Sequence, residues 1–190
     1  MSRTLIISNF VLFQLGWLAC VLGGANQLPL AGSLVAATVI AIHIWRAGNP
    51  MAEIRLVISA LIIGLIFESL LTLNQISRYP SGIIVEGFAP HWMVMMWGLF
   101  ATTMNVSMRW VNNLSLPLII LLGAVLAPLS YLAGNRLQGV TFTDTTTALL
   151  WIAAGWAVLF PLLTLIAKRN NGYSSNKLIT ENDDRSYANV

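Results

Sequence analysis

Long apolar stretches alternate with short polar breaks from about residue 5 to residue 167 of the chain. The stretches cover residues 5–25, 28–46, 52–75, 91–111, 116–133 and 147–167. Each has about 18–24 residues, which as a helix suits a hydrocarbon core about 30 Å thick. Breaks such as residues 48–50 and 79–82 contain glycine and proline, which stop helices. The pattern predicts an all-α fold, a polytopic membrane bundle of six transmembrane helices.

The chain divides into a membrane domain and a tail. Residues 1–167 form the predicted six-helix domain, and residues 168–190 are polar, which predicts a disordered cytoplasmic tail. The first stretch follows Arg3 and ends in small residues, as a signal peptide does. Its length of about 20 residues and its polar Asn9 and Gln14 favour a retained first helix.

Composition and charge support this interpretation. Apolar residues make up 57% of the chain and charged residues 9%, whereas soluble domains have roughly 45–50% and 25%. If both termini are cytoplasmic, eight of the ten lysines and arginines lie on the inner side, and only Arg78 and Arg136 lie outside. Such an asymmetry is typical of multi-pass proteins and favours an even number of spans.

Residues 56–75 of the third stretch contain one ionisable residue, Glu68. A carboxylate in hydrocarbon is costly, so it needs a partner, a proton or a water-filled cavity. Ala60, Gly64 and Glu68 follow one another at i, i+4 spacing, and small residues at this spacing let another helix approach closely. We therefore expect Glu68 on the packed face of its helix, slightly outward of the midplane.

Three roles for Glu68 are open. It fastens helices as a neutral or hydrogen-bonded carboxyl, with Gln14 as the nearest expected partner. It handles a proton or cation in a small transporter. Alternatively, it is a catalytic or head-group-binding carboxylate that faces a cavity near the outer surface.

The third role defines a set of candidate site residues near the outer surface. Few arginines lie there, and phosphate head groups favour arginine. The candidate catalytic residues are Glu68 and His91. The candidate substrate-binding residues are Arg136, Arg78, Gln14 and Tyr131.

Metal and cofactor chemistry has no support in the sequence. His43 and His91 are expected on opposite sides of the membrane, so they cannot ligate one ion. The single cysteine, Cys20, excludes an intrachain disulfide and a cysteine-cluster metal site. No phosphate-binding loop, dinucleotide fingerprint or zinc-protease motif occurs. We expect no metal site and no cofactor.

Five stretches carry a family resemblance: residues 9–23, 67–69, 97–110, 128–137 and 155–161. The fourth reads Pro-Leu-Ser-Tyr-Leu-Ala-Gly-Asn-Arg-Leu. With them the chain resembles a bacterial inner-membrane family catalogued as domain of unknown function 2878, whose members more often have aspartate at the position of Glu68. The resemblance implies a small multi-pass protein of the bacterial inner membrane without an established activity. It also hints at lipid chemistry, because genes for cyclopropane-type fatty-acid modification tend to lie nearby.

We therefore expect an enzyme or accessory factor that acts on membrane lipid, with Glu68, His91 and Arg136 converging below the outer surface. The alternatives are a small proton-coupled transporter and a structural scaffold. Nucleic acid is not an expected partner, because no sizeable basic patch occurs outside the tail. A homo-oligomer or a membrane-protein partner stays open.

Overall fold

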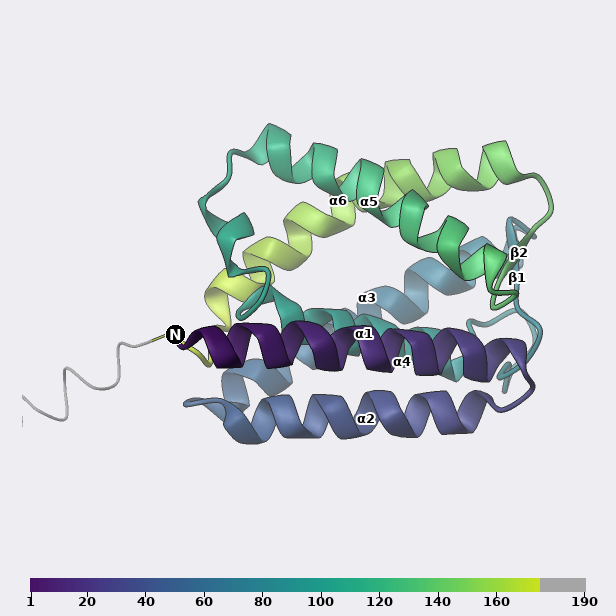
Figure 1. Cartoon of the computed structure of the whole chain (residues 1–190). Helices are drawn as coiled ribbons and strands as arrows, with labels where there is room; N and C mark the ends of the chain where they lie inside the picture. Colours follow the sequence, from purple (N-terminus) through teal and green to yellow (C-terminus); the bar gives the residue numbers. More distant parts are fainter. Residues whose placement is uncertain (175–190) are drawn as a thin grey trace, which may run out of the picture.

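The computed structural model describes residues 1–174, and within them the chain is almost entirely helical (Figure 1). Its six α-helices are α1 (Arg3–Ala25), α2 (Pro29–Arg46), α3 (Pro50–Leu73), α4 (His91–Met104), α5 (Leu116–Arg136) and α6 (Thr145–Arg169). All except α4 are long and apolar enough to cross a membrane. The helical, membrane-type bundle is therefore confirmed, whereas six full spans and the cytoplasmic termini stay predictions.

The fourth helix is shorter than its apolar stretch indicates. We expected a helix over residues 91–111, but α4 has 14 residues and is followed by a turn and a short 3₁₀ helix, η1 (Arg109–Asn113). At 1.5 Å per residue, α4 rises about 21 Å, less than the hydrocarbon core.

A polar side chain from α1 stabilises the interruption that follows α4. Asn9 donates to the Thr102 carbonyl and accepts from the backbone N–H and the hydroxyl of Ser107. In hydrocarbon, free backbone groups require such partners. The interruption is therefore a built feature of the fold rather than a frayed helix end.

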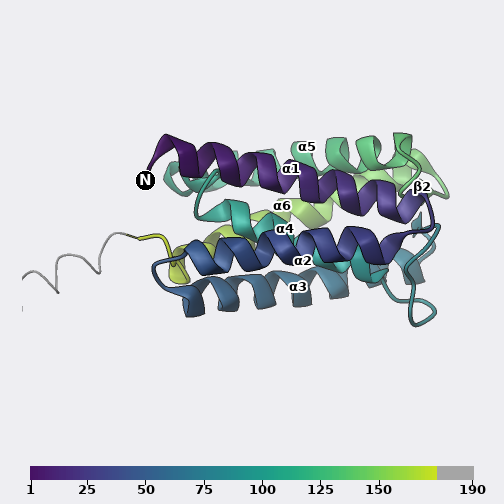
Figure 2. The same cartoon turned by 60° about the horizontal axis from the view of Figure 1, so that its bottom comes forward.

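The short helix α4 lies in the middle of the bundle, where α1, α2, α3 and α6 pack against it. α1 and α2 form an antiparallel pair, whereas α5 and α6 run in opposite directions and cross each other (Figures 1 and 2). α5 packs mainly on α6, so α6 connects this second hairpin to α3 and α4. The strands β1 (Ser77–Arg78) and β2 (Thr141–Phe142) pair antiparallel and join the α3–α4 and α5–α6 connections.

The small-residue face of α3 is buried as expected. Ala60, Gly64 and Glu68 are all buried. A Cβ at Gly64 would overlap Cγ of Trp97, so only glycine lets this tryptophan lie across the helix. The closeness of α3 and α4 therefore depends on this glycine.

The N-terminus and the end of α6 lie at the same end of the bundle (Figure 1). The expected domain boundary at Ala167 falls inside α6, which continues to Arg169. Gly172 is buried beyond it, and Tyr173 is half-buried. Residues 175–190, most of the predicted tail, lie outside the described residues.

Candidate functional site

Glu68 is completely buried and accepts hydrogen bonds from three aromatic side chains. The Tyr79 hydroxyl donates to Oε2 at 2.7 Å. The Trp97 indole N–H donates to Oε1 at 2.8 Å, and the Tyr131 hydroxyl donates to the same oxygen. The three donors come from the α3–α4 connection, from α4 and from α5, so this one carboxyl links three parts of the chain to α3. The fastening role is therefore present in the structure, with partners other than the expected Gln14.

The connection that carries Tyr79 closes over Glu68 at the end of the bundle opposite the N-terminus (Figure 1). Ala89 N–H donates to the Ser69 hydroxyl at 3.0 Å. Ser81 donates to the Gly24 carbonyl at 2.7 Å, and its own carbonyl accepts from the Trp92 indole at 3.0 Å. These bonds attach the connection to α3, α1 and α4. The α3–α4 connection is therefore held in place over Glu68 by hydrogen bonds.

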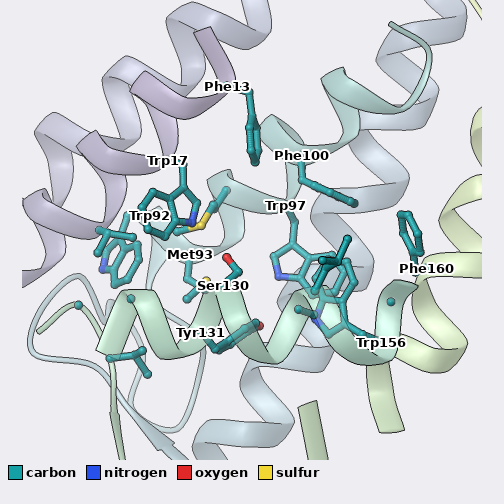
Figure 3. Close-up of a pocket in the computed structure, with 18 of the residues that line it drawn as sticks. Phe13, Trp17, Trp92, Met93, Trp97, Phe100, Ser130, Tyr131, Trp156 and Phe160 are labelled. Carbon is teal, nitrogen blue, oxygen red and sulfur yellow. The ribbon is translucent and has the colours of Figure 1, made fainter. Parts of the chain in front are cut away.

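A cavity of about 260 Å³ lies between α1, α4, α5 and α6 (Figure 3). Its polar lining groups are few, and aromatic side chains dominate its wall. The aromatic lining residues are Phe13, Trp17, Trp92, Trp97, Phe100, Tyr131, Trp156 and Phe160. Leu126, also in the lining, is 50% exposed on the surface of α5. The cavity therefore reaches the apolar outer face of the bundle.

Two of the side chains that bond Glu68 also belong to the lining of the cavity. Trp97 and Tyr131 line the cavity and also donate to the Glu68 carboxyl. The Trp97 ring stacks on Trp156, with centroids 4.7 Å apart and an angle of 27° between the planes. Figure 3 shows Tyr131, Trp97 and Trp156 together along one side of the space. A ligand in the cavity would contact two side chains whose polar ends are held by one carboxyl.

The other residues expected at the site lie elsewhere. His91 Nδ1 is 2.7 Å from the Ser33 hydroxyl, which links α4 to α2. Arg78, Arg136 and Gln14 are exposed. Within residues 1–174 none of these four residues forms a hydrogen bond or ion pair with Glu68.

This placement corrects the expected convergence of Glu68, His91 and Arg136, and the expected pair of Glu68 with Gln14. The hydrogen-bond partners of Glu68 are instead Tyr79, Trp97 and Tyr131, of which only Tyr131 was among the candidate site residues. Head-group binding by the outer arginines stays a prediction.

A second buried carboxylate, Glu53, lies at the opposite end of α3, and the sequence reasoning missed it. Glu53 Oε2 pairs with His43 Nε2 at 2.8 Å. Its Oε1 accepts from Asn105 Nδ2 at 2.9 Å and from the Gly172 N–H at 2.7 Å. The signal was present: Glu53 lies seven residues before Ala60, two helical turns along the same buried face.

The segment after α6 is held at this second cluster. The Tyr173 hydroxyl donates to the His43 carbonyl at 2.6 Å, and burial raises the pKa of Tyr173 to about 12. His43 is buried and paired with Glu53. Within residues 1–174 no group of three or more His, Cys, Asp or Glu side chains could hold a metal ion. We interpret this second cluster as a structural clamp.

Comparison with known proteins identifies a family and little more. A family profile described as "Protein of unknown function (DUF2878)" matches residues 6–162. No curated protein matches the chain, and no solved structure matches it.

Proposed function

We propose that this chain, which belongs to the DUF2878 family and is built of apolar membrane-type helices, binds the apolar part of a membrane lipid. In this proposal the ligand occupies the cavity beside Glu68, where the protein modifies it or presents it for modification. The observation that carries the proposal is the aromatic cavity itself, whose wall includes two side chains fixed by a buried carboxyl.

The size and lining of the cavity suit a hydrocarbon segment. An apolar protein cavity of about 150 Å³ binds benzene, so the volume of about 260 Å³ has room for roughly ten carbon atoms. Ligand pockets combine an apolar wall with a few placed polar groups, and the Tyr131 hydroxyl is such a group. Leu126 and the other α5 side chains near the opening face the region where lipid would lie. A membrane-dissolved ligand would enter sideways without passing through water.

The enzymatic form of this proposal relies on proton chemistry. Tyr131 lines the cavity, and Glu68 stands directly behind it in the same hydrogen bond. Together they could move a proton to or from a bound lipid, and Tyr131 would be the group that touches this ligand. His91 is bonded to Ser33 and takes no part in this version.

The transport alternative has less support. A proton path needs hydrated polar groups on both sides of Glu68. The inner polar residues Asn9, His43 and Asn105 are instead buried and hydrogen-bonded to protein groups. Nothing in residues 1–174 thus favours a continuous polar route from Glu68 to the inner end of the bundle.

A matched pair of α5 variants tests the proposal. Leu126→Trp fills the opening of the cavity, whereas Val125→Trp adds the same side chain at a 47% exposed position outside the lining. We would measure lipids bound to each purified variant by native mass spectrometry, and membrane lipids of a deletion strain complemented with each. We expect Leu126→Trp to lose bound lipid and to resemble the deletion strain, and Val125→Trp to resemble wild type. Equal lipid binding by both variants would refute the proposal.

A further inference from the structure

Within the described residues 1–174, Glu68 has no positively charged partner. Its three hydrogen-bond donors are the neutral side chains Tyr79, Trp97 and Tyr131. The only ion pair among residues 1–174 joins His43 to Glu53 at the other end of α3. A carboxylate in a dry interior is costly when no opposite charge is near. The cavity of about 260 Å³ beside it is a space in which such a charge could sit.

The cavity wall suits a particular kind of cation. A divalent metal ion or a sodium ion requires several oxygen ligands, and the lining is almost wholly apolar. Organic ammonium groups bind instead over the faces of tryptophan, tyrosine and phenylalanine rings. Trp97 and Trp156 stack on one another in the cavity lining, and Tyr131 lines the same side of the space (Figure 3).

The hydrogen bonds to Glu68 strengthen this preference. Trp97 and Tyr131 donate their polar hydrogens to a carboxyl group, so electron density shifts toward their rings when that group is ionised. The attraction of a ring face for a cation is electrostatic, and it increases where water is excluded. Carboxylate and rings therefore act on a cation in the cavity in the same direction.

We propose that the ligand of this cavity carries a quaternary or tertiary ammonium group, held over Trp97, Trp156 and Tyr131 with Glu68 as its counter-charge. This inference rests on the proposed function, because it names the chemical class of ligand for the same cavity. An ammonium head group of a membrane lipid and a free amphiphilic amine share this chemistry.

Two probes of the same shape test the charge. Benzyltrimethylammonium is a quaternary cation, and neopentylbenzene is its neutral isostere. We would measure both by saturation-transfer NMR with the full chain in lipid nanodiscs, using empty nanodiscs as the blank. We expect the wild type to bind the cation at least about tenfold more tightly than the isostere. Equal affinities would overturn the inference, and binding of the isostere would still support the proposed function.

Two further variants assign the effect to named groups. Glu68→Gln keeps the size of the side chain and removes its charge, so we expect the preference for the cation to decrease. Trp156→Leu removes a ring whose indole nitrogen makes no hydrogen bond within residues 1–174. It should weaken cation binding, whereas Trp151→Leu, at a 57% exposed position of the same helix, should not. Unchanged cation preference in both Glu68→Gln and Trp156→Leu would overturn the inference.

Competing ligands distinguish the two sources of the ammonium group. Displacement of the probe by lysophosphatidylcholine, but not by lysophosphatidylglycerol, supports a lipid head group. Displacement by dodecyltrimethylammonium alone supports a free amphiphilic amine. If neither probe binds and Leu126→Trp leaves bound lipid unchanged, the proposed function itself fails, which is a different result from equal binding of the two probes.

Discussion

Replacement of Glu68 by leucine and by glutamine should have very different effects on stability. Glu68→Leu leaves the donors of Tyr79, Trp97 and Tyr131 without their acceptor in a buried site. Each buried donor left unpaired costs about 1–3 kcal/mol. The two tyrosine hydroxyls can rotate toward other acceptors, whereas the Trp97 N–H is fixed by its ring. We therefore expect a loss of about 3–5 kcal/mol in the free energy of unfolding.

Glu68→Gln should cost about 1 kcal/mol or less. Its carbonyl oxygen can accept from Trp97 and Tyr131, and its amide can donate to the Tyr79 hydroxyl, which accepts as readily as it donates. In the opposite orientation the amide NH₂ group of the glutamine would face the Trp97 N–H. Both groups are donors and the indole cannot rotate, so only one amide orientation is favourable. This difference between the variants follows from the geometry of three donors around one carboxyl.

The assay is an SDS titration of the purified protein in mixed micelles, followed by far-ultraviolet circular dichroism. A double-mutant cycle with Trp97→Phe isolates the bond to the indole. Trp97→Phe should cost less in the Glu68→Leu background than in wild type, with a coupling of about 1–2 kcal/mol. Equal losses for Glu68→Leu and Glu68→Gln, or additive losses in the cycle, would refute the reasoning.

Three further predictions concern other parts of the bundle. Gly64→Ala should displace Trp97 and lower the SDS midpoint, because the new Cβ would overlap Cγ of this ring, and overpacking costs about 1–3 kcal/mol. Glu53→Leu removes the acceptor of the Gly172 N–H, which lies 2.7 Å away, so limited proteolysis should cut residues 170–174 faster. The pKa of Tyr173 is raised by burial from 10.0 to about 12, so the neutral phenol is favoured in the folded state. Its contribution to holding this segment should be complete below pH 10 and be lost as the pH rises to about 12, measured by the same proteolysis.

Matched controls accompany these variants. Gly48→Ala should leave the SDS midpoint unchanged, because the nearest atom to its added Cβ would be 3.4 Å away. Arg55→Leu, at an exposed position near Glu53 on the same helix, should leave proteolysis unchanged. Faster cutting in Arg55→Leu would show that any change at this end of α3 releases the segment. A proteolysis rate that already rises between about pH 7 and pH 9 would contradict the assignment to Tyr173.

Periodicity placed helix faces correctly where small residues marked them. The spacing of Ala60, Gly64 and Glu68 predicted the buried face of α3, because residues four apart lie on one side of a helix. The same rule shows why Gln14 was a poor partner for Glu68. It lies two residues from the buried Gly16, about 200° around α1, and is exposed.

Contacts across the bundle were less accessible to sequence reasoning. Trp97 was missed because a tryptophan in an apolar run has no visible partner until the facing helix is known. The space left by Gly64 was the available clue. The end of α4 at Met104 depends on Asn9, which is 93 residues from Thr102 in the chain. Hydropathy cannot register such a contact, so it predicted a longer helix.

The sequence by itself determined that this protein is a bundle of apolar helices, with a carboxyl group on a packed face of α3. Those properties follow from local composition and from the helical repeat, which every segment carries within itself. The tertiary structure alone decided that Glu68 meets Tyr79, Trp97 and Tyr131, and that a cavity opens beside them. Hydrogen-bond partners and empty space depend on how separate helices rotate and approach one another. The side chains of three distant segments fix that arrangement together, and no single stretch of the sequence encodes it.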